Sequence, residues 1–137
     1  MLPVFKKPIV LLRLEGLAVF LLALVIYWQQ SFGWTLFLST VLLPDLALLG
    51  YLVNAAVGAT AYNVTHSKLL PGALAIIAIV TGNALFSALA LIWFVHIGVD
   101  RMLGYGLKYP DGFKVTHLGT IGQMGDESRG SYLLCGK

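Results

Sequence analysis

The sequence predicts an all-α protein, an integral membrane bundle of four transmembrane helices. Of its 137 residues, 58% are hydrophobic and 11% are charged, a composition far from that of soluble domains. The apolar residues also gather into segments of roughly 20, the length that an α-helix needs to cross the hydrocarbon core of a bilayer. The chain's expected surroundings are therefore a lipid bilayer.

The first expected helix runs from Ile9 to Trp28. Arg13 lies near its start and can extend to the membrane surface, whereas the shorter Glu15 sits deeper in the apolar segment. An uncharged turn, Gln29–Gly33, follows. Aromatic residues flank this turn as in the belts that mark membrane interfaces, namely Tyr27, Trp28, Phe32 and Trp34.

The second and third helices are expected over Trp34–Val53 and Ala56–Val80. Pro44 predicts a kink in the second, because proline removes a helical hydrogen bond, and the kink adjoins the charged Asp45. The third begins with a polar half that contains His66 and should be bent or split near Pro71. The predicted kink and the predicted bend or split therefore lie near polar residues, Asp45 and His66, that are rare in apolar helices.

The fourth helix is expected from Ala84 to about Tyr105. His96 and Asp100 are four residues apart, so their side chains lie on one helical face and can bind the same ion or water. Residues 1–119 are predicted to form the membrane domain. A polar, glycine-rich cytoplasmic tail without usable periodicity, predicted to be disordered, occupies residues 120–137.

Basic residues predict the topology. They precede or open the first helix and recur from the end of the last helix onward, so both termini are expected in the cytoplasm. The net charge of +3 is better explained by this topology signal than by a nucleic-acid surface, and no nucleic-acid partner is expected. These basic residues are Lys6, Lys7, Arg13, Arg101, Lys108, Lys114, Arg129 and Lys137.

Polar groups from all four helices are expected at one depth. Counting at 1.5 Å per residue puts them about 8–15 Å from the cytoplasmic helix ends. Carboxylates and imidazoles suit zinc, manganese or iron, so a divalent metal site is one interpretation. A buried polar network, with Arg13 and Arg101 neutralising the acids, explains the pattern equally well. The five groups are Glu15, Asp45, His66, His96 and Asp100.

Four blocks of the sequence resemble a small bacterial membrane-protein family known as domain of unknown function 4260. The resemblance covers about Leu11 to Gly119 and implies a multi-pass protein of the bacterial inner membrane. No established activity comes with it. The blocks are LRLEG (Leu12–Gly16), PDLALLGY (Pro44–Tyr51), YNVTHS (Tyr62–Ser67) and HIGVDRMLGYGLKYPDGFKVTHLG (His96–Gly119).

A weaker similarity connects the same blocks to bacterial inner-membrane metal-dependent hydrolases, which are compared with zinc-dependent phospholipases C. It implies a divalent metal, zinc before manganese or iron, with the ligands Asp45, His66, His96 and Asp100. Tyr62-Asn63 stands where those proteins have a doubled histidine. We add His117 as a further ligand outside that match.

Two functions from different classes follow. In the first, the chain is a metal-dependent hydrolase that acts on a phosphoester or another lipid-linked substrate at the cytoplasmic side. Glu15 is then the candidate general base, and Arg101 is the candidate to hold an anionic headgroup, because its fork matches phosphate oxygens. In the second, a non-enzymatic bundle, either an assembly partner or a small transporter or proton-path component, uses the same residues as a buried polar network.

Overall fold

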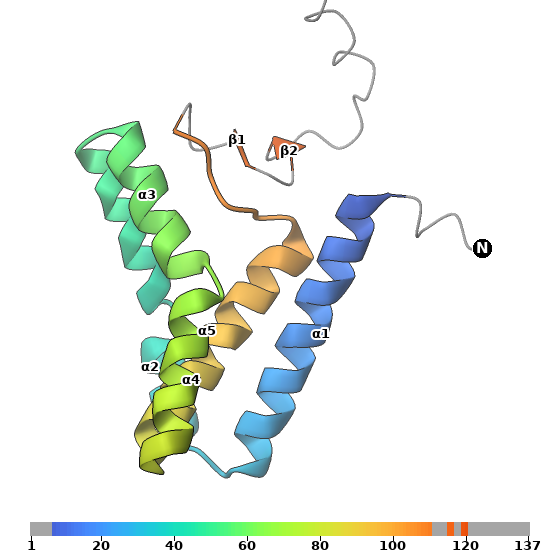
Figure 1. Cartoon of the computed structure of the whole chain (residues 1–137), viewed down its shortest axis with the longest axis vertical. Coiled ribbons are helices and arrows are strands. Elements are labelled where there is room, and N and C mark those ends of the chain that lie inside the picture. The colour runs from blue at the N-terminus through green and yellow to red at the C-terminus, as the bar shows by residue number, and fades with distance from the viewer. Residues whose placement is uncertain (1–6, 111–114, 117–118, 121–137) are drawn as a thin grey trace, which may run out of the picture.

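A computed structural model describes residues 7–110, 115–116 and 119–120. Helices form nearly all of the regular structure in this part of the chain (Figure 1). Four spans within it are long and apolar enough to cross a membrane: Pro8–Gln29, Trp34–Leu52, Ala55–Thr81 and Ala84–Leu103. The predicted all-α membrane bundle is confirmed. The proposed ligand His117 and residues 121–137 of the predicted tail (120–137) lie outside the described residues.

The first span is one continuous helix, α1 (Pro8–Gln29), with proline at its first position. Proline is favoured there because the first helical N–H groups have no partner within the helix. α1 packs along α5 (Ala84–Leu103). The two backbones approach closely at Gly16 and Gly98, where an added Cβ would lie 2.5 Å from the Arg101 Cβ and 2.7 Å from the Phe20 nitrogen, respectively. Small residues at such crossings are typical of membrane helices.

The second span is broken where the sequence predicts a kink. α2 (Trp34–Thr40) ends just before Pro44, and the chain resumes as the 3₁₀ helix η2 (Leu43–Leu52). Pro44 occupies the first turn of η2, where its missing N–H leaves no hydrogen bond unmade. Asp45 follows in the same turn, so the break brings a carboxylate to the start of a new helix.

The third span is also broken, into α3 (Ala55–His66) and α4 (Leu69–Thr81). The Asn54 side chain caps α3 by accepting a hydrogen bond from the Val57 N–H at 2.8 Å. Extended backbone at Ser67 ends the helix. The split expected near Pro71 therefore lies slightly earlier, because proline fits the first turn of α4 and begins that helix instead of breaking it.

Asn83 caps α5 through a hydrogen bond from the Phe86 N–H, and Gly104 ends the helix with a φ of 94°. A short antiparallel pair, β1 (Val115–Thr116) and β2 (Gly119–Thr120), lies near the N-terminal end of α1 in Figure 1. The two connections α1–α2 and α4–α5 lie together at the opposite end of the bundle. The start of α1 and the end of α5 thus lie at the same end of the bundle.

The apolar core lies near the connection between α1 and α2. Tyr27 is fully buried with Ala88 and Ile92, and its hydroxyl donates to the Gly33 carbonyl at 2.7 Å. Trp28, in contrast, is 70% exposed, as expected for a residue facing lipid. The predicted interfacial aromatic belt is therefore divided, because Tyr27 finds a hydrogen-bond partner inside the bundle and packs there instead.

Candidate metal centre

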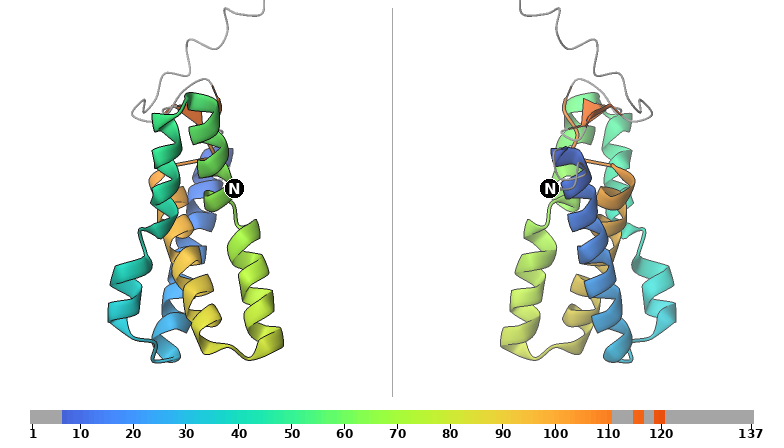
Figure 2. Two further views of the ribbon diagram at one scale, coloured as in Figure 1. Left: turned by 90° about the vertical axis from the view of Figure 1, so that its left-hand side faces the viewer. Right: turned by 90° about the vertical axis from the view of Figure 1, so that its right-hand side faces the viewer.

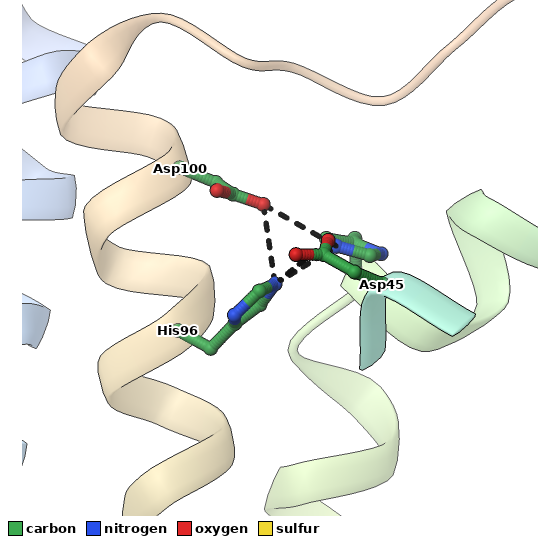
Figure 3. Close-up of side chains that lie close together, drawn as sticks. Asp45, His96 and Asp100 are labelled. Carbon is green, nitrogen blue, oxygen red and sulfur yellow. Dashed lines mark hydrogen bonds and ion pairs between the residues drawn. The ribbon is translucent and has the colours of Figure 1, made fainter. Parts of the chain in front are cut away.

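Four side chains from three of the spans converge at the two helix breaks. Asp45 comes from the first turn of η2, His66 ends α3, and His96 and Asp100 lie one turn apart on α5. One ligand atom from each lies within 4.8 Å of the others. Figure 3 shows the Asp45, His96 and Asp100 side chains pointing toward one another. The sequence-predicted convergence of these four residues is confirmed.

Five of the six separations are close to the edges of a small coordination polyhedron, and all six are within 4.8 Å. His66 Nε2 lies 3.1 Å from His96 Nε2, 3.2 Å from Asp45 Oδ1 and 3.3 Å from Asp100 Oδ2. His96 Nε2 lies 3.3 and 3.5 Å from the same two carboxylate oxygens. Ligands bound tetrahedrally to zinc at about 2.0–2.2 Å are separated by about 3.3–3.6 Å. The four atoms therefore surround a space of about the size that one such ion needs.

The helix breaks explain how residues far apart in sequence meet. His66 is the last residue of α3, so its side chain is presented where the chain turns toward α4. Asp45 lies in the first turn of η2, which packs along α3. Interrupted helices are tolerated at membrane depth where they line a site inside the protein. Both interruptions in this bundle supply a member of the group.

Hydrogen bonding fixes the tautomer of His66. Its Nδ1 lies 3.1 Å from the Tyr62 carbonyl oxygen and 2.9 Å from the Thr65 hydroxyl. A carbonyl oxygen can only accept, so we assign the proton to Nδ1, which leaves a lone pair on Nε2 facing the group. Metal-binding histidines commonly donate their second N–H to a carbonyl in this way. The surroundings of His66 thus hold its Nε2 toward the other three residues.

The group is closed on the histidine side and open at Asp45. The side chains of His66 and His96 are 0% and 7% exposed, whereas that of Asp45 is 39% exposed. Asp100 is intermediate at 18%. Water or a substrate group can therefore approach from the Asp45 side without movement of the histidines.

The segment after α5 covers the other side of the group. Asn63 holds it in place, accepting from the Lys108 N–H at 2.6 Å and donating to the Lys108 carbonyl at 2.7 Å. The Lys108 ammonium lies 4.6 Å from the centre of the Tyr62 ring, and this ring stacks on His66 at 3.8 Å. Burial lowers the pKa of Lys108, while the negative charges of Asp100 and Asp45 act to raise it. The Lys108 ammonium therefore lies next to the group, over the ring that stacks on His66.

Arg101 and Glu15 are placed differently from the four ligands. The Arg101 guanidinium donates to the His66 carbonyl at 3.0 Å and to the Tyr105 carbonyl at 2.6 Å, so it connects α5 to the end of α3. Glu15 is exposed on α1 and is not brought into the group of four. The sequence-based depth count put Glu15 at the same level, but depth does not determine which way a side chain points.

Sequence reasoning missed Lys108 as part of this region. It lies beyond the last helix, where helical spacing gives no signal, and its place depends on its backbone pairing with Asn63. Asn63 itself shares a helical face with His66 in the sequence pattern, so its proximity was predictable but its partner was not.

Comparison with known proteins gives one match. The family model described as Domain of unknown function (DUF4260) matches residues 9–121, which confirms the family resemblance of the four sequence blocks. No curated protein and no solved structure matches the chain. The weaker similarity to metal-dependent hydrolases stays a prediction.

Proposed function

The chain belongs to the DUF4260 family, and we propose that it is a membrane-embedded protein that binds a divalent metal, zinc before manganese or iron. The observation that carries this proposal is the set of five separations of 3.1–3.5 Å among two imidazole nitrogens and two carboxylate oxygens. Imidazole and carboxylate without thiolate suit these three metals.

The charge of the group supports a cation. Two carboxylates and two neutral imidazoles carry a charge of about −2, which a divalent ion would balance. Without a cation, lone pairs and negative oxygens face one another inside a membrane-spanning bundle, an arrangement that costs several kcal/mol. The Arg101 guanidinium meets two backbone carbonyls, so its hydrogen bonds do not provide this balance. The single positive charge of Lys108, whose ammonium lies over the Tyr62 ring, offsets at most one of the two negative charges.

We further propose that the protein is a hydrolase acting on a phosphoester or another lipid-linked bond. A bound divalent ion lowers the pKa of a coordinated water and polarises a substrate oxygen. Four protein ligands in a tetrahedron would leave no place for that water, so hydrolysis needs five-coordination or displacement of one carboxylate. Asp45, the most exposed of the four, lies where this place would open.

The remaining roles follow from position. His66 and His96 hold the ion, and Asp100 holds it from the Lys108 side. Lys108, whose ammonium lies over the Tyr62 ring, and Arg101 are the two cations of this region, and we assign them to an anionic headgroup. Glu15 stays a candidate general base. If it has this role, Glu15→Gln should lower turnover and leave the metal content unchanged.

We place the protein in the bacterial inner membrane with both termini in the cytoplasm. The four spans put the start of α1 and the end of α5 on one side. Basic residues flank these two ends, including Lys7, Arg13, Arg101 and Lys108. The metal centre then lies in the cytoplasmic half of the bundle.

Elemental analysis tests the metal proposal. Protein purified in detergent without added metal should contain zinc, manganese or iron near one ion per chain, and Asp100→Asn should lower this content. Glu15→Gln is the matched control, because it also neutralises one acid of an apolar span but lies outside the group. A metal-free wild-type protein whose melting temperature does not respond to chelator would support the buried polar network instead.

A generic phosphodiester, bis(p-nitrophenyl) phosphate, tests the hydrolase proposal. The metal-loaded protein should release p-nitrophenolate, and chelator or Asp45→Asn should abolish this release. Metal content near one ion per chain without hydrolysis of this diester or of phospholipid vesicles would leave a structural metal site and reject the enzyme.

A further inference from the structure

An apolar pocket of about 270 Å³ lies beside the metal centre. α5 forms its floor, and α2 with η2 on one side and α4 on the other form its walls, as the left view of Figure 2 shows for these helices. This volume approaches the range of about 300–1,000 Å³ typical of ligand sites. The pocket is lined by Thr40, Leu43, Pro44, Thr65, Leu74, Leu89, Ile92 and Trp93.

Residues of the pocket lining adjoin the metal centre along the chain. Pro44 and Thr65 immediately precede Asp45 and His66. Ile92 precedes His96 by four residues, so it lies one turn below it on the same face of α5. Along α5 the order is therefore pocket, metal ligands and then the segment that carries Lys108.

The polar atoms of the pocket lining already have partners inside the protein. The Trp93 Nε1–H donates to the Thr65 carbonyl at 2.7 Å. The Thr40 hydroxyl donates to the Leu36 carbonyl at 2.7 Å, and the Thr65 hydroxyl lies within 3.1–3.3 Å of three backbone carbonyls. The lining consequently offers an occupant only hydrocarbon, and a hydrocarbon chain is the ligand that fits it.

The pocket opens sideways, toward the bilayer. Leu43 in its lining is 52% exposed and Leu74 is half-buried, whereas Ile92 is only 2% exposed. In a membrane-spanning bundle, an apolar recess that opens between two spans faces the acyl chains of the surrounding lipid. An acyl chain can therefore enter without passing through water.

We propose that this pocket binds one hydrocarbon chain of a membrane lipid and thereby delivers the lipid's oxyanion head, a carboxylate or a phosphate, to the metal centre. The ligand's polarity matches the order along α5: the chain lies against Leu89 and Ile92, and the head lies one to two turns further along, at His96 and Asp100. The head-group part of this inference rests on the proposed function. The chain-binding part does not.

Photocrosslinking tests the proposal. The full chain is placed in phosphatidylcholine vesicles that contain a few per cent of a probe with a diazirine in the acyl chain. One arm uses a fatty acid, whose head is a carboxylate, and the other uses phosphatidic acid, whose head is a phosphate. Labelled residues are mapped by mass spectrometry, with and without zinc, and with inorganic phosphate as a competitor that has no chain.

We expect label to concentrate on Leu74, Leu89 and neighbouring pocket residues. It should exceed the label on Leu38 and Ile79, which are 73% and 81% exposed and report ordinary contact with lipid. Zinc should increase the pocket label, because it adds a partner for the head. Inorganic phosphate should not remove it, because the chain contributes most of the binding.

Two leucines of α5 give a matched pair of variants. Leu89 lines this pocket, whereas Leu91 lines a separate hollow between α1, α4 and α5. Leu89→Trp should lower the pocket label by about tenfold, the effect of losing contact with about two methylene groups. Leu91→Trp should leave it unchanged. Leu89→Ala enlarges the pocket and should keep the label. This second variant keeps the test valid if the Leu89→Trp protein does not fold.

The outcomes separate this inference from the metal proposal. Label spread evenly over exposed residues and insensitive to Leu89→Trp would overturn chain binding, even if the protein contains zinc. Concentrated label that does not respond to zinc would keep chain binding and overturn delivery of the head to the metal. Concentrated, zinc-dependent label in only one arm would identify the head as carboxylate or phosphate.

Discussion

The two levels of this bundle that bury polar atoms do so in different ways. At the α1–α2 end, the Tyr27 hydroxyl donates to one carbonyl, and the ring packs against Phe32, Trp34 and Phe37 at centroid distances of 5.3–5.7 Å. The Tyr27 hydroxyl thus has its hydrogen-bond partner within the protein. At the level of the helix breaks, imidazole nitrogens and carboxylate oxygens face one another across 3.1–3.5 Å.

This difference indicates what each level contributes. Aromatic packing with a satisfied hydroxyl stabilises a fold without needing a ligand. A buried group made mainly of acceptors is costly until a cation or protons join it. We therefore assign stability to the aromatic end and, following the proposed function, binding to the polar level. Substitutions at the two levels should accordingly affect different observables.

The largest effect is expected from His66→Ala. It removes a fully buried ligand whose Nδ1 is already held by hydrogen bonds. Metal affinity should fall by more than about 100-fold, the upper end of what loss of an outer-shell partner costs. Competition with a chromogenic chelator measures it. An unchanged affinity would show that any metal binds elsewhere.

Tyr27→Ala should give the opposite pattern. Removing this buried ring should lower the free energy of unfolding by about 3–5 kcal/mol, as for other large-to-small core substitutions, and metal content per folded chain should stay the same. The neighbouring Trp28→Ala is the control, because this ring is 70% exposed. A loss of metal in folded Tyr27→Ala protein would mean that the two levels are not independent.

A smaller effect is expected from Asn63→Ala, which removes both hydrogen bonds to the Lys108 backbone. The free energy of unfolding should fall by about 1–3 kcal/mol. Metal affinity should change by less than about tenfold, because no ligand is lost. Thr60→Ala on the same helix is the control, since its hydroxyl bonds only locally to the Ala56 carbonyl. Equal melting temperatures for the two variants would exclude a holding role for Asn63.

Sequence periodicity and helix chemistry were sufficient for the spans and for the four converging residues. His96 and Asp100 follow from four-residue spacing, and Pro44 marks the break that positions Asp45. The pattern could not show that Glu15 stays outside the group of four, because a residue's depth in the membrane does not determine the direction of its side chain. It also could not place Lys108, whose position depends on a contact 45 residues away in sequence, with Asn63.

The small residues show the same limit. The small residue Ala88 of α5 is 1% exposed and packs with Tyr27 of α1, as its size predicts, whereas the sequence does not single out Gly16 and Gly98, where α1 and α5 also approach closely. Composition indicates that helices can approach closely, whereas the partner helix is fixed only when all faces pack. Gly98 faces α1, which leaves the face with His96 and Asp100 for the metal centre.

X-ray absorption spectroscopy of the zinc-loaded wild-type protein tests the central claim most directly, because it reports the atoms bound to the ion. The account predicts nitrogen and oxygen ligands at about 2.0–2.2 Å, no sulfur, and scattering from two imidazole rings. His96→Ala should reduce this to one ring. A spectrum without imidazole scattering, or one that His96→Ala leaves unchanged, would contradict the account.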